Sequence, residues 1–147
     1  MRIETLSRNV CSDVLSRNHT ARLACAKDGQ PYVVPISYGF SGNQIYAFST
    51  VGKKIEWMRA NPLVAVEVFE ADGERGWRTV VVDGRFEELT PGPYYDKDSD
   101  FAWKLLKKHA NWWEPGSIDA EGEAPSKSYV YYRIQIVTMT GRHGIVQ

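Results

Sequence analysis

The chain is 147 residues long and 43% of its residues are hydrophobic, which predicts one globular domain and excludes a disordered chain. Lysine plus arginine and aspartate plus glutamate number 18 each, so the formal net charge is zero, which disfavours a general nucleic-acid binder. Met1–Arg8 is polar and no apolar run reaches transmembrane length, so we expect a soluble, cytoplasmic protein with no membrane partner. Cys11 and Cys25 fit no metal or disulfide spacing and are expected to be core thiols.

Apolar spacing in the first part of the chain predicts one helix followed by strands. The helix is expected over Thr5–Asn18, and the strands over Ala21–Ala26, Tyr32–Phe40 and Gln44–Ser49. Asp28 and Gly29 predict a tight hairpin turn between the first two strands. Pro35 cannot donate a hydrogen bond to a neighbouring strand, so it predicts a sheet edge or a bulge.

The rest of the chain predicts two further helices and three strands. The helices are expected over Lys53–Ala60 and Asp100–His109, and the strands over Leu63–Phe69, Trp77–Leu89 and Tyr129–Val137. Asn61 and Pro62 end the first of these helices, because proline disfavours helix in the residue before it. Gly84 predicts a bulge inside a long strand. Five or six strands joined by short turns favour a mainly β protein, a small antiparallel barrel.

The segment Phe48–Lys54 combines several groups that a bound phosphate needs. Ser49 and Thr50 supply hydroxyls at the end of a strand, and Gly52 lets the backbone turn and approach a ligand closely. Lys53 and Lys54 add two positive charges at the start of a helix, where unpaired N–H groups already favour an anion. Taken alone, the segment also fits a solvated helix start with ordinary surface lysines.

Several segments, in this order, resemble a known family. They are Arg22–Ala24, Gly29–Tyr38, Ile45–Lys54, Asn61–Pro62, Trp77–Glu88 and Tyr132–Arg142. Together they resemble the flavin-binding split barrels related to pyridoxamine 5′-phosphate oxidase, and within that group the nitroimidazole-resistance-like branch. The resemblance implies a six-stranded antiparallel split barrel, a homodimer, and FMN bound in the cleft between the subunits.

Carried over position by position, the resemblance places the FMN phosphate on Lys53 and Lys54. It also places the strand segment Val33–Tyr38 alongside the flavin ring, where Pro35 frees neighbouring backbone groups to bond the polar edge of the ring. A second strand, at Trp77–Thr79, completes the pocket. The cofactor-binding residues that it implies are Val33, Val34, Pro35, Ile36, Ser37, Tyr38, Phe48, Ser49, Thr50, Lys53, Lys54, Trp77, Arg78 and Thr79. Trp77 fits a core or dimer-interface aromatic equally well.

Two departures from the oxidase itself make pyridoxamine-phosphate oxidation an unexpected activity for this chain. Val33 and Tyr38 stand where the oxidase has an arginine and a basic residue, and its C-terminal substrate-binding motif is absent. No catalytic triad order and no metal-ligand spacing occurs, so the sequence predicts no catalytic residue and no metal.

The expected function is therefore that of an FMN-dependent oxidoreductase acting on a small molecule, either a nitro compound or a quinone. The flavin would carry the electrons while the protein holds and tunes it. One alternative is a flavin- or haem-binding carrier or sensor without turnover, with His19, His109 or His143 as the axial haem ligand. Another alternative is an F420-dependent reductase that uses the same two lysines for the cofactor phosphate.

Overall fold

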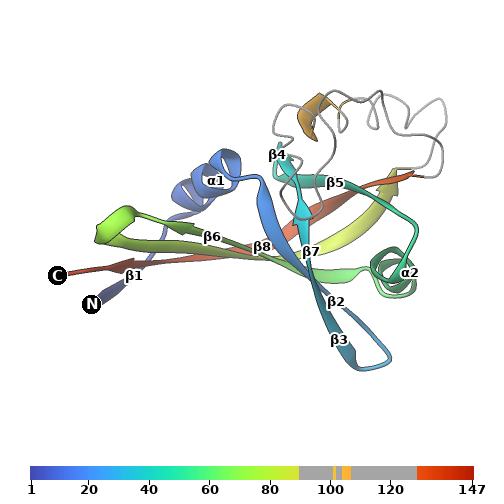
Figure 1. Cartoon of the computed structure of the whole chain (residues 1–147), viewed down its shortest axis with the longest axis horizontal. Coiled ribbons are helices and arrows are strands. Elements are labelled where there is room, and N and C mark those ends of the chain that lie inside the picture. The colour runs from blue at the N-terminus through green and yellow to red at the C-terminus, as the bar shows by residue number, and fades with distance from the viewer. Residues whose placement is uncertain (90–100, 102–103, 107–128) are drawn as a thin grey trace.

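A computed structural model describes residues 1–89, 101, 104–106 and 129–147, and within them the chain forms one antiparallel sheet (Figure 1). Its strands are β1 (Arg2–Thr5), β2 (Thr20–Lys27), β3 (Gln30–Ser37), β4 (Gly39–Ser41), β5 (Gln44–Thr50), β6 (Leu63–Ala71), β7 (Gly76–Leu89) and β8 (Tyr129–Ile145). The helices are α1 (Arg8–Arg17), α2 (Lys53–Ala60) and the short 3₁₀ helix η1 (Gly73–Arg75). The strand order is β3-β2-β6-β7-β8-β5-β4, and β1 pairs with β8.

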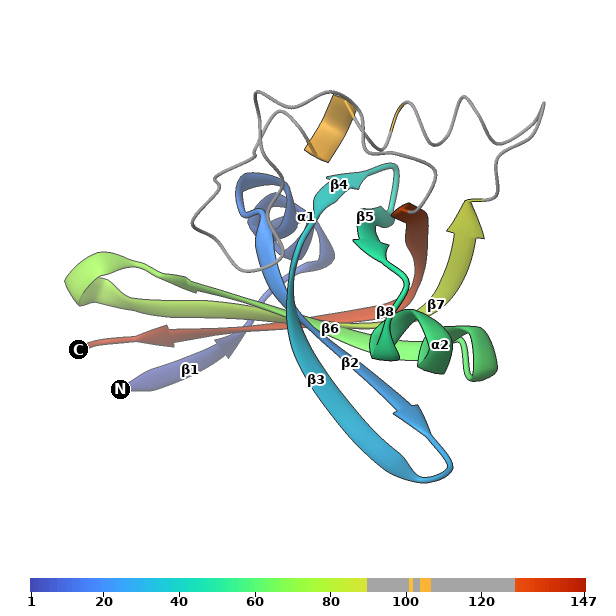
Figure 2. The ribbon, with the colours of Figure 1, turned by 45° about the vertical axis from the view of Figure 1, so that its right-hand side comes forward.

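The sheet is strongly coiled, so that the β2–β3 hairpin crosses the long strands β6, β7 and β8 at a steep angle (Figure 2). Strands β6 and β7 alternate buried and exposed residues, as expected for a sheet with one face against a core. The helices close that core: α1 contributes Cys11, Val14 and Leu15, and α2 contributes Ile55 and Met58. Both cysteines are buried free thiols, as expected.

Most of the predicted elements are confirmed, including the fold class. The six long strands were all expected, and α2 has the predicted bounds. Asp28 and Gly29 both have positive φ, at 51° and 78°, which confirms the tight hairpin turn. The register of β7 against β8 shifts between Asp83 and Gly84, which confirms the bulge. Pro35 lies in β3, the end strand of the sheet, as predicted for an edge.

One strand and several boundaries differ from the prediction. Strand β1 was not expected, and α1 begins at Arg8 because the Ser7 hydroxyl accepts a hydrogen bond from the Val10 N–H at 3.3 Å and caps the helix there. The helix ends at Arg17, with Asn18 as its C-cap. The expected strand over 32–40 is divided at Tyr38 into β3 and β4, although the Tyr38 N–H still donates to the His19 carbonyl at 2.9 Å, in register with the β2–β3 pairing.

Strand β8 runs to Ile145, eight residues beyond the predicted end, because β7 and β1 pair with its second half. Of the helix predicted over 100–109, only residues 101 and 104–106 are described, and the rest lies outside the described residues. Among the described helices, none has the length and apolar character needed to cross a bilayer.

The bulge at Gly84 gives a test of the fold. A Cβ placed on Gly84 would lie 2.5 Å from Cγ2 of Ile134 and 2.8 Å from the carbonyl oxygen of Gln135. We expect Gly84→Ala to lower the free energy of unfolding by about 1–3 kcal/mol, the usual cost of overpacking, in a urea titration. Gly52→Ala is the control, because a Cβ there would meet nothing within 4 Å. Equal stability of both variants would contradict the close packing at the bulge.

Candidate functional site

The junction between β5 and α2 brings four of the predicted phosphate ligands together. Ser49 and Thr50 end β5, and Lys53 and Lys54 form the first turn of α2. Gly52, the N-cap residue, has no side chain to cap the helix, so the first N–H groups of α2 are open to a ligand. Gly52 itself is extended, with φ −162° and ψ −163°, and the chain bends at Val51 and Gly52 between β5 and α2. The expected close approach of a ligand to Gly52 is sterically open, because a Cβ added there would meet nothing within 4 Å.

Lys53 is exposed, yet its ammonium group has a defined position. Nζ lies 4.4 Å from the centre of the Tyr32 ring and 4.6 Å from that of the Trp57 ring. Both distances are within the range of a cation–π interaction. The two rings are themselves in contact, with centroids 5.8 Å apart and planes tilted by 59°.

Lys54 is half-buried, and burial lowers the pKa of its ammonium group, while Cys25 acts in the opposite direction. Burial also raises the pKa of the Cys25 thiol, which Lys54 and Lys53 partly offset. An incompletely solvated cation is stabilised by an anion beside it. The Lys54 ammonium group therefore has the properties expected of a group that binds an anion. By contrast, the Ser49 hydroxyl is engaged locally and donates to the Thr50 carbonyl at 2.8 Å.

Strand β3 presents only part of its predicted flavin contacts. Val33 and Pro35 are exposed and lie on one face, while Val34 and Ser37 are half-buried. Ile36 and Tyr38 are core residues. The Tyr38 hydroxyl donates to the Leu15 carbonyl at 2.8 Å, and burial raises the pKa of Tyr38. From β5, Phe48 packs against the Tyr131 ring, with centroids 5.7 Å apart.

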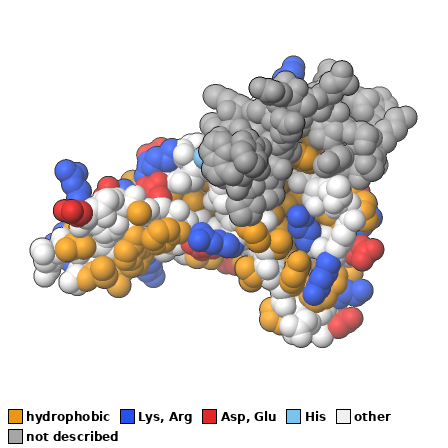
Figure 3. Space-filling view, in the orientation of Figure 1, with side chains coloured by type: hydrophobic (Ala, Val, Ile, Leu, Met, Phe, Trp, Pro, Cys, Tyr) orange, Lys and Arg blue, Asp and Glu red, His pale blue; other side chains and the backbone are white. Residues whose placement is uncertain are grey.

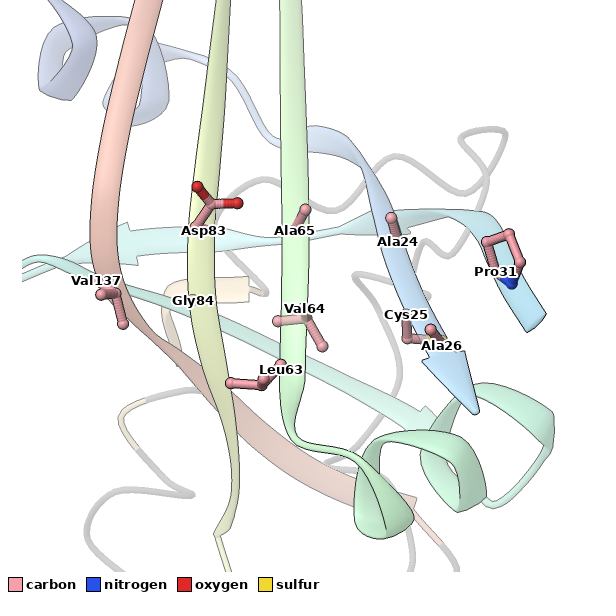
Figure 4. Close-up of a pocket in the computed structure, with 10 residues that line it drawn as sticks. All are labelled: Ala24, Cys25, Ala26, Pro31, Leu63, Val64, Ala65, Asp83, Gly84 and Val137. Carbon is pink, nitrogen blue, oxygen red and sulfur yellow. The ribbon is translucent and has the colours of Figure 1, made fainter. Parts of the chain in front are cut away.

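The sheet face opposite the core is apolar and hollowed. A hollow of about 480 Å³ is lined by residues of the five strands β2, β3, β6, β7 and β8, and Figure 4 shows its mostly small lining side chains. Its lining residues are Ala24, Cys25, Ala26, Pro31, Leu63, Val64, Ala65, Asp83, Gly84 and Val137. A neighbouring hollow includes Val33 and Val81, with Arg22 and Glu67 paired at 3.3 Å. The volume is within the range of small-ligand sites. We call the sheet face opposite the core, which contains both hollows, the outer face.

Trp77, Arg78 and Thr79 lie far from the two lysines within one chain. Arg78 pairs with Glu70, seven residues along β6 from Leu63, which is about 23 Å at the usual rise per strand residue. They belong to the arm formed by the β6–β7 hairpin and the ends of β8 and β1, whereas α2 lies at the opposite end of β6 (Figure 1). One chain alone does not assemble the predicted set.

On the arm, these three residues have structural contacts of their own. The Trp77 indole lies against Gly144, where an added Cβ would come within 2.4 Å of the ring. The Thr79 hydroxyl donates to Glu67 Oε1 at 3.2 Å. Arg78 is paired with Glu70 at 3.4 Å and with Asp72 at 3.2 Å.

Glu70 is the centre of this charged cluster. Its carboxylate accepts hydrogen bonds from Arg17 at 2.6 Å and from the Asn18 amide at 2.8 Å, in addition to the contact with Arg78. The hydrogen bond from Arg17 is the main reason why the pKa of Glu70 lies below its ordinary value. The cluster ties α1 to the arm and so has a structural role.

The described residues hold no group of three or more side chains suited to bind a metal ion. Of the histidines considered for haem, His109 lies outside the described residues. His143 Nε2 lies 3.9 Å from Asp72, on the arm. His19 is half-buried between α1 and β2.

Sequence reasoning missed Tyr32 and Trp57. Trp57 follows Lys53 by four residues, a spacing that places both on one side of a helix and is visible in the sequence. Nothing local indicated Tyr32, which reaches Lys53 from the β2–β3 hairpin.

Comparison with known proteins identifies the family of this chain. The sequence pattern of the family described as pyridoxamine 5′-phosphate oxidase matches residues 7–143. The chain belongs to this family. Its fold is accordingly the split barrel of the pyridoxamine 5′-phosphate oxidase family.

Three relatives show how far the likeness extends. An uncharacterized protein of Rhizobium meliloti (strain 1021) is 42% identical over 146 residues, covering 97% of this chain and 95% of the relative. The crystal structure of a FAD-binding protein from Mesorhizobium loti is 50% identical, with a TM-score of 0.85, covering 98% of this chain and 99% of that one. A putative 5-nitroimidazole antibiotic resistance protein from Bacteroides thetaiotaomicron has a TM-score of 0.73 over 97% and 89% of the two chains, but only 14% identity, so it shows the fold alone.

The Glu70 cluster predicts a pH-dependent contribution to stability. A carboxylate with a lowered pKa stabilises the folded state above the ordinary carboxyl pKa of 4.5, and the contribution is lost as the pH falls through the folded-state value. We expect Glu70→Gln to lower the free energy of unfolding by about 1–3 kcal/mol at neutral pH. In urea titrations the difference from wild type should shrink at acidic pH. Glu74→Gln, at an exposed residue of η1, is the control. A difference that stays constant with pH would contradict the assignment.

Proposed function

We propose that this protein binds a flavin nucleotide, with the riboflavin 5′-phosphate group held at the β5–α2 junction. The observation that carries the proposal is the start of α2, where Lys53 and Lys54 follow a helix end that no side chain caps. An anion there meets open N–H groups, the positive end of the helix dipole and two ammonium groups. The 50% identical relative described as a FAD-binding protein supports the same class of ligand.

The proposal covers FMN and FAD alike, because both contain the riboflavin 5′-phosphate group. FMN is the form implied by the sequence, and the Mesorhizobium loti relative adds FAD. Lys53, Lys54 and the Thr50 hydroxyl would hold the phosphate, while the exposed side of β3 at Val33 and Pro35 would border the ring. When bound, the flavin supplies the electron or hydride transfer.

A homodimer with the cofactor between subunits is part of the proposal. The β5–α2 junction and the Trp77–Thr79 segment are separated along a single chain, and a second copy would bring one copy's arm to the other copy's lysines. The outer face supplies the contact surface, with exposed Val33, Leu63, Phe69, Val81 and Val137. Exposed apolar side chains gathered on one face favour an interaction site there. Figure 3 shows apolar side chains gathered over the arm as well.

The reaction that we propose is the reduction of a small molecule, a nitro compound or a quinone, by the bound flavin. Arg78 and Thr79 are held by Glu70 and Glu67, so their role at the site would be to shape and position, not to transfer protons. Substrate selection would then rest on the shape of the cleft between the subunits.

The two lysines are tested by flavin titration, followed by absorption and by quenching of flavin fluorescence. Loss of two charge-assisted contacts costs about 3–6 kcal/mol, so Lys53→Ala/Lys54→Ala should abolish binding of FMN and FAD at micromolar concentration. Lys27→Ala, at an exposed lysine of the β2–β3 hairpin, should bind like wild type. A wild-type protein that binds neither flavin would refute the proposal, and saturation by F420 or haemin instead would identify the alternative cofactor.

The homodimer is tested by light scattering on a size-exclusion column. The wild type should have about twice the 16.7 kDa mass of one chain. Val81→Asp places a charge in the middle of the outer face, so it should give monomers and weaken flavin binding. Ser16→Asp adds the same charge to the exposed side of α1 and should remain dimeric. A monomeric wild type that still binds flavin would exclude a site shared between subunits.

A further inference from the structure

The aromatic pair around Lys53 has a geometry that the phosphate proposal does not itself require. Tyr32 and Trp57 are half-buried and pack against the edge of the core, while the ammonium group of the exposed Lys53 lies over both rings. We call these three residues the Lys53 clamp. Its parts come from β3 and α2, so it also joins the β2–β3 hairpin to the start of the helix.

Three arginines elsewhere in the described chain are fixed in a different way. Arg17, Arg59 and Arg133 each form two or more hydrogen bonds to a single carboxylate, from Glu70, Glu88 and Glu87. Those partners neutralise the charge that they hold. An aromatic ring attracts a cation through its quadrupole and carries no net charge. Among the described residues no carboxylate pairs with Lys53, so the clamp fixes its position and leaves its full charge available to a ligand.

A lysine side chain without such partners samples many rotamers, and a ligand that fixes it must overcome that lost entropy. The rings restrict Lys53 before any ligand arrives. Preorganisation of this kind increases affinity because the ordering cost falls on folding and not on binding.

We propose that Tyr32 and Trp57 are positioning residues for the flavin phosphate, acting through Lys53 by holding its ammonium group beside the open N-terminus of α2. This inference rests on the proposed function. It assigns the two rings no direct contact with the flavin, and the effect of each ring depends on the presence of Lys53 and of a phosphate on the ligand.

A double-mutant cycle on flavin binding tests the inference. Trp57→Leu and Tyr32→Leu should each weaken FMN binding about tenfold, the size expected for loss of cation–π contacts, while Trp57→Phe and Tyr32→Phe keep a ring and should bind nearly as wild type does. In a Lys53→Met background, Trp57→Leu should cause no further loss, because the group that it positions is gone. Riboflavin, which lacks the phosphate, should bind wild type and Trp57→Leu equally well.

Several outcomes would overturn the inference. Additive losses in the Lys53→Met background would show that Trp57 acts independently of Lys53. An equal loss for riboflavin would assign the effect to packing, and a loss confined to FAD would place the rings against its adenine. Thermal melting of each flavin-free variant shows whether the substitution has caused a general loss of folding. The two rings are changed in separate variants, so if one variant does not fold, the other still tests the inference. A wild type that binds no flavin at all refutes the proposed function, whereas binding without coupling refutes only the clamp.

Discussion

Strand β8 carries hydrogen-bonded neighbours along both of its edges, and this pairing sets the positions of the β5–α2 junction and of the arm. Strand β7 follows one edge from Leu89 to Gly76, while β5 occupies the first half of the other edge and β1 the second half. With seventeen residues, β8 spans the whole molecule, and this length lets β5 and β1 pair with it one after the other along the same edge. It therefore places the β5–α2 junction at one end and the arm at the other.

The arm and the β5–α2 junction also differ in whether their charged side chains are compensated by opposite charges. On the arm, Glu70 gathers Arg17 and Arg78 into a closed cluster in which charges compensate one another. At the junction, Lys53 and Lys54 are held by aromatic rings and by partial burial, and their charge is not compensated by the described residues. Compensated charges stabilise the fold, whereas uncompensated ones raise its energy until an anion arrives. The contrast distinguishes the two ends of the molecule, and the end with uncompensated charge is the one at which we propose that an anion binds.

Local signals predicted much of the fold and the phosphate end of the site. Pro62 marked the end of α2 and Gly84 marked the bulge, because each acts through its own backbone. Strand β1 escaped prediction because it has only four residues, all exposed and only Ile3 apolar, and its partner among the described strands lies more than a hundred residues away in β8. The contact of Tyr32 with Lys53 and the pairing of Arg78 with its carboxylate partners depend on strand register, which no local pattern specifies. The predicted flavin contacts on β3 and the arm stay predictions.

The prolines of β3 have a consequence for how copies of this protein can associate. The two-residue turn makes Lys27 and Gln30 a hydrogen-bonded pair, so Pro31 and Pro35 fall at the alternate positions, whose nitrogens point away from β2. Two of the outward-facing donors on this free edge are therefore missing. A strand from another molecule could not extend the sheet there with a regular ladder. Open-ended growth of the sheet by strand addition is therefore blocked at that edge.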